Sequence, residues 1–281
     1  MPARPPAESA GARWGLRLLA LGYLLFLLVL PVSLVFYRSF AGGWDVFWNA
    51  ITSPDALHAL QLTLIITAIT VPLNAVFGVI AALVLVRRRV PGRPLISALI
   101  DLPLALSPVV VGLCIILVWG KNGWFGFVQN DLNYQVVFAV PGMVLATIFV
   151  CLPFVVREVV PVLREVGTDQ EEAATILGAG AFQTFWRITL PAIRWGVVYG
   201  VVLTTARALG EFGAVAVVSG RITGNTETMT LFVSQQYQQI GADSQTSAYA
   251  ASLVLVLIAM ITVVAMNLLN RKGRARGDHG H

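Results

Sequence analysis

Long apolar runs separated by short polar segments dominate the hydropathy pattern of the chain. Six of these runs are long enough to cross a bilayer as a helix, which takes about 20 apolar residues. They cover about residues 16–37, 57–86, 95–119, 136–156, 195–218 and 247–269. The pattern therefore predicts an all-α polytopic membrane protein with six transmembrane helices.

Two of the runs have features that refine this prediction. The run 57–86 is long and contains Pro72, so tilt or a kink is expected to absorb its excess length. The run 16–37 is longer than the apolar region of a signal peptide and lacks a small-residue cleavage site. An uncleaved first helix is therefore expected.

Composition and charge agree with a membrane protein. Hydrophobic residues make up 57% of the chain and charged residues only 12%, against about 25% charged in a soluble domain. The formal charge is +5, but the positive residues flank the apolar runs. Topology explains this charge better than a nucleic-acid partner does.

The distribution of Lys and Arg predicts the orientation. Fifteen of the 19 such residues lie at the two chain ends and in the loops after the second and fourth runs; the others are Arg38, Lys121, Arg207 and Arg221. Because cationic residues are enriched on the cytoplasmic side, both termini and the fourth loop are predicted to be cytoplasmic. The segments 1–15 and 270–281 are then cytoplasmic tails, the second of which is expected to be disordered.

The residue types that usually carry catalysis or metal binding are sparse. Cys114 and Cys151 lie inside apolar runs and are expected to be packing residues without a disulfide. His58, His279 and His281 have no metal-ligand spacing, so no metal site is predicted. An intramembrane enzyme would need a nucleophile with its base, paired aspartates or histidine ligands in the spans, and no such set is present.

The loop after the fourth run contains a polar helical hairpin at residues 168–191. Thr168 or Asp169 is the predicted N-cap of its first helix, and acidic residues follow in the first turn, where the helix dipole favours them. A second short helix is expected at residues 181–188, before the fifth span.

The hairpin carries a recognisable signature. Its residues match the form E-A-A-x3-G-x9-I-x-L-P without a gap, at Glu172, Ala173, Ala174, Gly178, Ile188, Leu190 and Pro191. This pattern resembles the EAA signature of ABC-importer permeases. The resemblance implies that these residues form a coupling helix that docks on a separate ATPase subunit. Small side chains at positions 173 and 174 would let the helix seat deeply, and Glu172 could pair with a basic partner or cap local amides.

Three further stretches extend the resemblance over most of the chain. "DLPLALSPVVVG", "PGMVLATIFVCLPFVVREVVP" and "ARALGEFGAVAVVSGRITGNTETMTL" resemble the CysW-type permeases of sulfate/thiosulfate importers. The resemblance implies a type I ABC importer permease (MetI-like) fold, with the permease domain at residues 57–269. The core R-A-x-G-E-F-G-A is shared with molybdate permeases, so a molybdate/tungstate permease is the alternative.

The resemblance also implies partners. These are a CysT-type permease subunit, a CysA-type ATPase dimer and a periplasmic or lipid-anchored sulfate-binding protein, assembled in a bacterial inner membrane. ATP and Mg would be bound by the ATPase, because this sequence has no G-x-x-x-x-G-K-[ST] loop. The chain is thus expected to be a non-catalytic subunit without a cofactor of its own. The coupling signature also argues against an ion-coupled carrier that acts alone.

Polar residues within the runs are candidates for the translocation path. Arg207 and Glu211 fall near the middle of the fifth run, four residues apart on one helix face, where ionised groups cost about 3 kcal/mol each. They form either a structural ion pair or part of a gate. Ser107 and Pro108 interrupt the third run, either as a plain kink or as a place where a hydroxyl and free amides contact an oxyanion.

One segment beyond the fifth run is predicted to be a short amphipathic helix. It is "TMTLFVSQQYQQIG", residues 228–241. It could receive the binding protein or simply close the loop.

Overall fold

The structure, a computed structural model, describes residues 10–88 and 90–277. The expected tails are only partly covered: residues 1–9, Arg89 and residues 278–281, with His279 and His281, lie outside the described residues. Every regular element in the described ranges is a helix. In chain order they are α1 (Ala10–Leu24), η1 (Leu25–Val29), α2 (Leu30–Ser39), α3 (Trp44–Thr52), α4 (Pro54–Arg87), α5 (Arg93–Ala105), α6 (Pro108–Trp119), α7 (Phe127–Asn130), α8 (Val140–Val166), α9 (Asp169–Ile176), α10 (Ala181–Thr184), η2 (Phe185–Thr189), α11 (Leu190–Leu209), α12 (Gly213–Val218), α13 (Met229–Gln238) and α14 (Ala242–Gly277).

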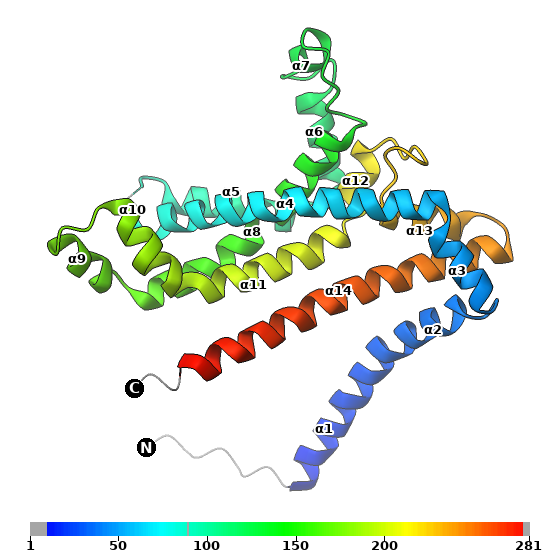
Figure 1. The fold of residues 1–281 in the computed structure, drawn as a ribbon, viewed down its shortest axis with the longest axis horizontal. Helices are drawn as coiled ribbons and strands as arrows, with labels where there is room; N and C mark the ends of the chain where they lie inside the picture. Colours follow the sequence, from blue (N-terminus) through cyan, green and yellow to red (C-terminus); the bar gives the residue numbers. More distant parts are fainter. Residues whose placement is uncertain (1–9, 89, 278–281) are drawn as a thin grey trace.

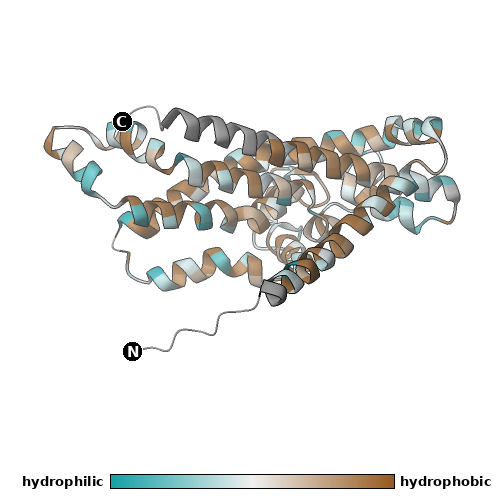
Figure 2. Cartoon of the chain, turned by 90° about the horizontal axis from the view of Figure 1, so that it is seen from below, coloured by the Kyte–Doolittle hydropathy of each residue, from teal (hydrophilic) through white to brown (hydrophobic). Residues whose placement is uncertain are grey.

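Four long helices, α4, α8, α11 and α14, run along the long axis of the molecule (Figure 1). Helix α9 lies at one end of this bundle, hereafter the hairpin end, and α3 and α13 lie at the opposite end. Apolar residues dominate the middle of the long helices and polar residues gather at both ends (Figure 2). This is the distribution expected of helices that cross a bilayer.

Helix α4 shows how the sequence sets the length of a span. It starts at Pro54, and the Ser53 hydroxyl accepts a hydrogen bond from the Ala56 amide at 3.3 Å. Its 34 residues continue through Pro72 without a break. At 1.5 Å per residue the helix is about 51 Å long, so it extends beyond the hydrocarbon core of a bilayer.

The centre of the bundle is the contact of α4, α8 and α11. Val155 of α8 is fully buried there. A Cβ added to Gly78 of α4 would lie 2.6 Å from the Val155 Cβ, and one added to Gly200 of α11 would lie 2.7 Å from the Val155 Cα. Glycine at these two positions therefore permits the close helix approach on which membrane bundles rely.

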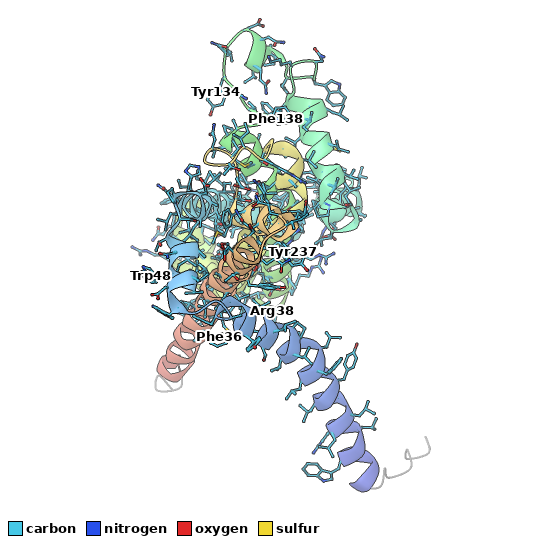
Figure 3. The ribbon with its side chains drawn as sticks, turned by 90° about the vertical axis from the view of Figure 1, so that its right-hand side faces the viewer. Phe36, Arg38, Trp48, Tyr134, Phe138 and Tyr237 are labelled. Carbon is cyan, nitrogen blue, oxygen red and sulfur yellow. The ribbon has the colours of Figure 1, made fainter. Side chains whose placement is uncertain are left out.

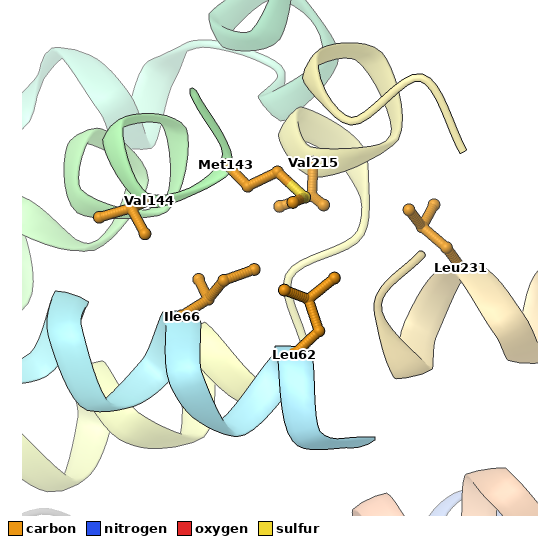
Figure 4. Packing of buried hydrophobic residues seen from close by; sticks show 6 residues of the cluster. All are labelled: Leu62, Ile66, Met143, Val144, Val215 and Leu231. Carbon is orange, nitrogen blue, oxygen red and sulfur yellow. The ribbon is translucent and has the colours of Figure 1, made fainter. Parts of the chain in front are cut away.

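A second packing centre lies nearer the opposite end. Its buried side chains come from α4, α8, α12 and α13 and point toward one another (Figure 4). They are Leu62, Ile66, Met143, Val144, Val215 and Leu231. This cluster fixes the short helices α12 and α13 against the long ones.

Two segments leave the bundle. The helix formed by α1, η1 and α2 contacts α14 through α2 and then diverges, and no residue in its most apolar window is buried. The arm formed by α6 and α7 projects away from α1 when the molecule is viewed along the bundle (Figure 3). Both segments expose apolar side chains, including Leu19, Phe26, Leu113 and Leu117.

The described residues contain five helices that are long and apolar enough to span a membrane, and a sixth span if the bent pair α5 and α6 is counted as one. The two halves of that pair are bent by 112°. Irregular backbone at Ser107 was predicted and is present, since α6 begins at Pro108. The helix predicted at residues 228–241 is present as α13.

Three boundary predictions are wrong. The fifth run is not one helix to residue 218, because the chain breaks after Leu209 and restarts as α12. The separate helix predicted at residues 181–188 is instead α10, which continues through η2 into α11. Residues 270–277, predicted to be a disordered tail, extend α14.

Candidate functional site

The predicted coupling segment is a hairpin between the end of α8 and the start of α11. Thr168 is the N-cap of α9, as one of the two predictions had it, although its hydroxyl caps no backbone amide. Gly178 follows α9 with a φ of +83°, a left-handed conformation that L side chains rarely adopt. The glycine of the signature is therefore required for the sharp reversal of the chain between α9 and α10.

An ion pair fastens the base of the hairpin to the bundle. The Nε of Arg87, at the end of α4, lies 3.0 Å from a carboxylate oxygen of Glu171 on α9. The other carboxylate oxygen of Glu171 accepts a hydrogen bond of 2.8 Å from the Thr189 hydroxyl. Both charged side chains are largely buried, 14% and 22% exposed. Charge-assisted bonds in such a setting are stronger than neutral ones, so α9 is held firmly against α4 and η2.

Arg87 also bonds the connection between α8 and α9. Its guanidinium donates to the Leu163 carbonyl at 3.1 Å and to the Gly167 carbonyl. A single side chain thus donates to carbonyl groups at the end of α8, where no further helical turn supplies amide donors for them.

The tip of the hairpin exposes apolar side chains. Ile176 and Leu177 are each 87% exposed, and Phe182 and Trp186 are also exposed. These residues belong to α9, α10 and the segments that directly follow them, and α9 and α10 lie at the hairpin end of the bundle (Figure 1). A contiguous exposed apolar patch that is not in lipid indicates a protein contact.

The residues of the signature divide between the tip and the base. Ala173 is exposed on α9, whereas Ala174 is buried against its own chain, so only Ala173 is free to meet a partner. Glu172 is exposed, and its carboxylate accepts a hydrogen bond of 2.7 Å from the Thr168 hydroxyl. Within the described chain Glu172 therefore bonds neither to a cation nor to a backbone amide.

The second half of the signature forms the base. Ile188 is half-buried in η2, and Leu190 starts α11 and packs against the cluster of α4, α8 and α11. Pro191 directly follows the π-helical turn η2, inside the continuous helix of residues 181–209. These three residues therefore belong to the base of the hairpin, where it joins the bundle, and not to its tip.

The candidate path residues lie at two helix breaks. An ion pair of 2.6 Å joins Arg207, in the last turn of α11, to Glu211, in the break before α12. The Glu211 side chain is 1% exposed, and its other carboxylate oxygen accepts a hydrogen bond of 2.8 Å from the Ala214 amide at the start of α12. Glu211 thus neutralises Arg207 and caps the new helix. Both residues were predicted near the middle of the fifth span on one helix face; instead the helix ends just after Arg207, and Glu211 lies beyond its end.

The two breaks touch each other. A Cβ on Gly213, at the start of α12, would lie 2.8 Å from the Cβ of Pro108, at the start of α6. Ser107, the N-cap residue of α6, is exposed. Two interrupted helices therefore meet at a point where only glycine fits, with Ser107 and Pro108 on one side and the residues after Glu211 on the other.

Several residues of the site could not be singled out in the sequence. Arg87 and Thr189 were not predicted, and Glu171 was counted only as an acid of the first turn. The sequence gives little indication of their role, because Arg87 is one of several positive residues that follow a predicted span. The apolar pair Ile176–Leu177 at the end of a polar helix, which is exposed in the structure, is easier to recognise in the sequence than Arg87. Among the described residues no group of His, Cys, Asp or Glu could hold a metal ion.

Comparison with known proteins identifies the family. The model of the family "Binding-protein-dependent transport system inner membrane component" matches residues 74–275. The CysW sulfate transport system permease protein of Synechocystis is 52% identical over 90% of this chain and 91% of its own length. The CysT permease protein of Salmonella typhimurium is 34% identical over 92% of both chains.

A solved structure shares the fold. It is a chain of a bacterial ABC transporter involved in the import of the acidic polysaccharide alginate. The two chains are 17% identical and superpose with a TM-score of 0.77 over 93% of this chain and 95% of the other. The protein therefore belongs to the inner-membrane components of binding-protein-dependent transport systems, and within them to the CysW-type sulfate permeases.

Proposed function

We propose that this chain is the transmembrane permease subunit of an ABC importer that moves sulfate or thiosulfate into the cytoplasm. It would hydrolyse no ATP itself, and its hairpin would couple transport to a partner ATPase. The molybdate alternative is not favoured, since relatives that are 52% and 48% identical to this chain are sulfate transport system permease proteins.

The observation that carries the coupling role is the contrast between the two ends of the hairpin. The base is fixed by the pair of Arg87 and Glu171, while the tip presents Leu177 at 87% exposure. A rigid base with an apolar tip can transmit a displacement of a bound partner into α8 and α11. We assign Glu172, Ala173 and Gly178 to the docking surface and its turn, and Ala174, Ile188, Leu190 and Pro191 to the seating of the hairpin.

The translocation gate is proposed at the contact of the two helix breaks. The pair of Arg207 and Glu211 balances charge there, so an oxyanion would meet no unpaired carboxylate. Ser107 is exposed beside Pro108 and offers a hydroxyl to a passing anion. Separation of Pro108 from Gly213 would open this point without unfolding a helix.

The partners follow from the exposed surfaces and the relatives. The diverging helix of α1 and α2 and the arm of α6 and α7 expose apolar side chains suited to a second permease subunit, for which a CysT-type chain is proposed. A CysA-type ATPase dimer carrying ATP and Mg would dock at the hairpin end. A sulfate-binding protein would dock at the opposite end, with α13 as a candidate receiver. Both termini would then be cytoplasmic in a bacterial inner membrane.

Copurification tests the coupling role. The chain is coexpressed with its proposed partner permease and ATPase, and Leu177→Ser is compared with wild type. Loss of one buried leucine from an interface costs about 1.5–3 kcal/mol, so ATPase retention should fall about tenfold or more. Gln170→Ser, an exposed polar change on the same helix, is the matched control. Equal ATPase retention by Leu177→Ser and wild type would contradict the docking role of the tip.

A further inference from the structure

A basic pocket lies between α5 and α8 at the hairpin end, away from the two helix breaks. Its volume is about 360 Å³, within the usual range of about 300–1,000 Å³ for small-ligand sites. Three arginines line it, together with one acid, one serine and apolar side chains. The polar lining residues are Arg93, Ser97, Asp101, Arg157 and Arg164.

The charges of the pocket are not balanced by the protein. The Arg157 Nε lies 2.9 Å from an Asp101 carboxylate oxygen, so these two charges neutralise each other. Arg93 and Arg164 have no acidic group within 4 Å among the described residues. The pocket therefore carries a formal surplus of two positive charges, a value suited to an anionic ligand.

The geometry of the hydrogen-bond donors indicates which chemical class of anion the pocket fits. Asp101 binds Arg157 only through its Nε, which orients that guanidinium and leaves its two terminal NH2 groups without another partner in the described chain. Arginine is the side chain best matched to tetrahedral and planar oxyanions, because its forked donors bind two oxygens at once. The Ser97 hydroxyl adds a neutral donor.

We propose that this pocket binds a tetrahedral oxyanion of the sulfate or phosphate type. Two sources share this chemistry: a free anion from the solution, or the phosphate of an anionic phospholipid. Basic pockets between transmembrane helices near a membrane surface bind lipid headgroups. The site would hold an oxyanion whether or not the chain transports sulfate.

The test uses the full-length chain purified in detergent, as wild type and as two single-arginine variants. Arg164→Ala removes an exposed arginine of the pocket. Arg194→Ala removes an arginine at the start of α11, outside the pocket, and is the matched control. Far-UV circular dichroism and gel filtration establish that the variants fold alike, and Arg93→Gln serves as a second pocket variant.

Two binding experiments separate the sources. In the first, calorimetric titration with sodium sulfate and sodium phosphate at constant ionic strength measures free-anion binding. In the second, native mass spectrometry measures retention of phosphatidylglycerol relative to phosphatidylcholine. Loss of one charge-assisted contact should weaken the relevant binding about tenfold in Arg164→Ala and leave Arg194→Ala at the wild-type level.

Either experiment can support the site. If sulfate or phosphate binding in the titration is weakened by Arg164→Ala and not by Arg194→Ala, the ligand is a free anion. If retention of phosphatidylglycerol is weakened in the same way, the ligand is a lipid headgroup. If neither ligand binds, or if Arg164→Ala and Arg194→Ala behave alike in both experiments, the pocket is not an oxyanion site.

Discussion

The pair of Arg87 and Glu171 makes a sharp prediction about the hairpin. Glu171→Gln keeps the shape of the side chain and removes its charge, so Arg87 loses its counter-ion while neutral hydrogen bonds can remain. Charge-assisted bonds contribute about 1.5–3 kcal/mol and neutral ones about 0.5–1.5 kcal/mol. The two side chains are only 14% and 22% exposed, so solvent screens the pair little. The free energy that holds the hairpin against the bundle should therefore fall by about 1.4 kcal/mol.

This loss predicts a roughly tenfold increase in local opening of the hairpin. The assay is amide hydrogen exchange in the purified protein. The reporting amides are those that donate within the hairpin, including Leu177 to the Ala173 carbonyl at 3.1 Å and Ala179 to the Ala174 carbonyl at 2.9 Å. Amides at the centre of α8 should exchange as in wild type, because the change is confined to the hairpin end.

Glu172→Gln is the matched control. Glu172 is the next carboxylate in the same helix, but it bonds only the Thr168 hydroxyl. A double-mutant cycle with Arg87→Gln should show strong non-additivity if the two side chains act as a pair. The reasoning is refuted if Glu171→Gln and Glu172→Gln exchange alike, or if the effects of Glu171→Gln and Arg87→Gln simply add.

Three other predictions concern stability, each read by thermal unfolding in detergent. Arg207→Gln leaves the buried Glu211 carboxylate without its counter-ion and should lower stability by about 3 kcal/mol. The double variant, which also carries Glu211→Gln, should regain most of this stability. Glu227 lies in the loop after α12, 1% exposed, and burial raises the pKa of its carboxyl above the ordinary value of 4.5. The folded state therefore keeps a proton that the unfolded chain releases, so stability is lost as pH rises from 4.5 through the folded pKa, and Glu227→Gln should escape this loss. Gly200→Ala would place a Cβ 2.7 Å from the Val155 Cα and should cost about 1–3 kcal/mol.

Each of these has a contrary result. If the single and double variants of the Arg207 pair melt at the same temperature, the pair is not an ionic unit. If wild type and Glu227→Gln lose stability in parallel as the pH rises above 4.5, another group is responsible for the pH dependence. Gly22→Ala, at a glycine with nothing within 4 Å of the added Cβ, should leave stability unchanged. An equal loss of stability in Gly200→Ala and Gly22→Ala would contradict the packing argument.

The spans could be predicted because a bilayer sets their length and composition. The break in the fifth run could not, since residues 195–218 are apolar almost throughout. It depends on Glu211, whose carboxylate pairs with Arg207 and also accepts from the Ala214 amide, which starts a new helix. A hydropathy pattern does not encode such a bond. In the same way, Pro108 predicted an interruption, but the 112° bend depends on the packing of α6 against α12.

The signature located the hairpin but not its anchor. Glu172 belongs to the signature, yet the carboxylate that binds the bundle is that of its neighbour Glu171. The reason is distance along the chain: Arg87 lies 84 residues away, and only the folded contact of α4 with α9 brings the two together. The signature therefore locates the hairpin in the sequence, whereas its anchor Arg87 is evident only from the fold.

Uptake of labelled sulfate is the most direct test of the function. The chain is expressed with its proposed partner permease, ATPase and binding protein in cells that lack their own sulfate importer, with unlabelled molybdate as competitor. Uptake that requires this chain and resists a modest excess of molybdate is the predicted result. Absence of sulfate uptake, together with molybdate entry that depends on this chain, would contradict a sulfate permease.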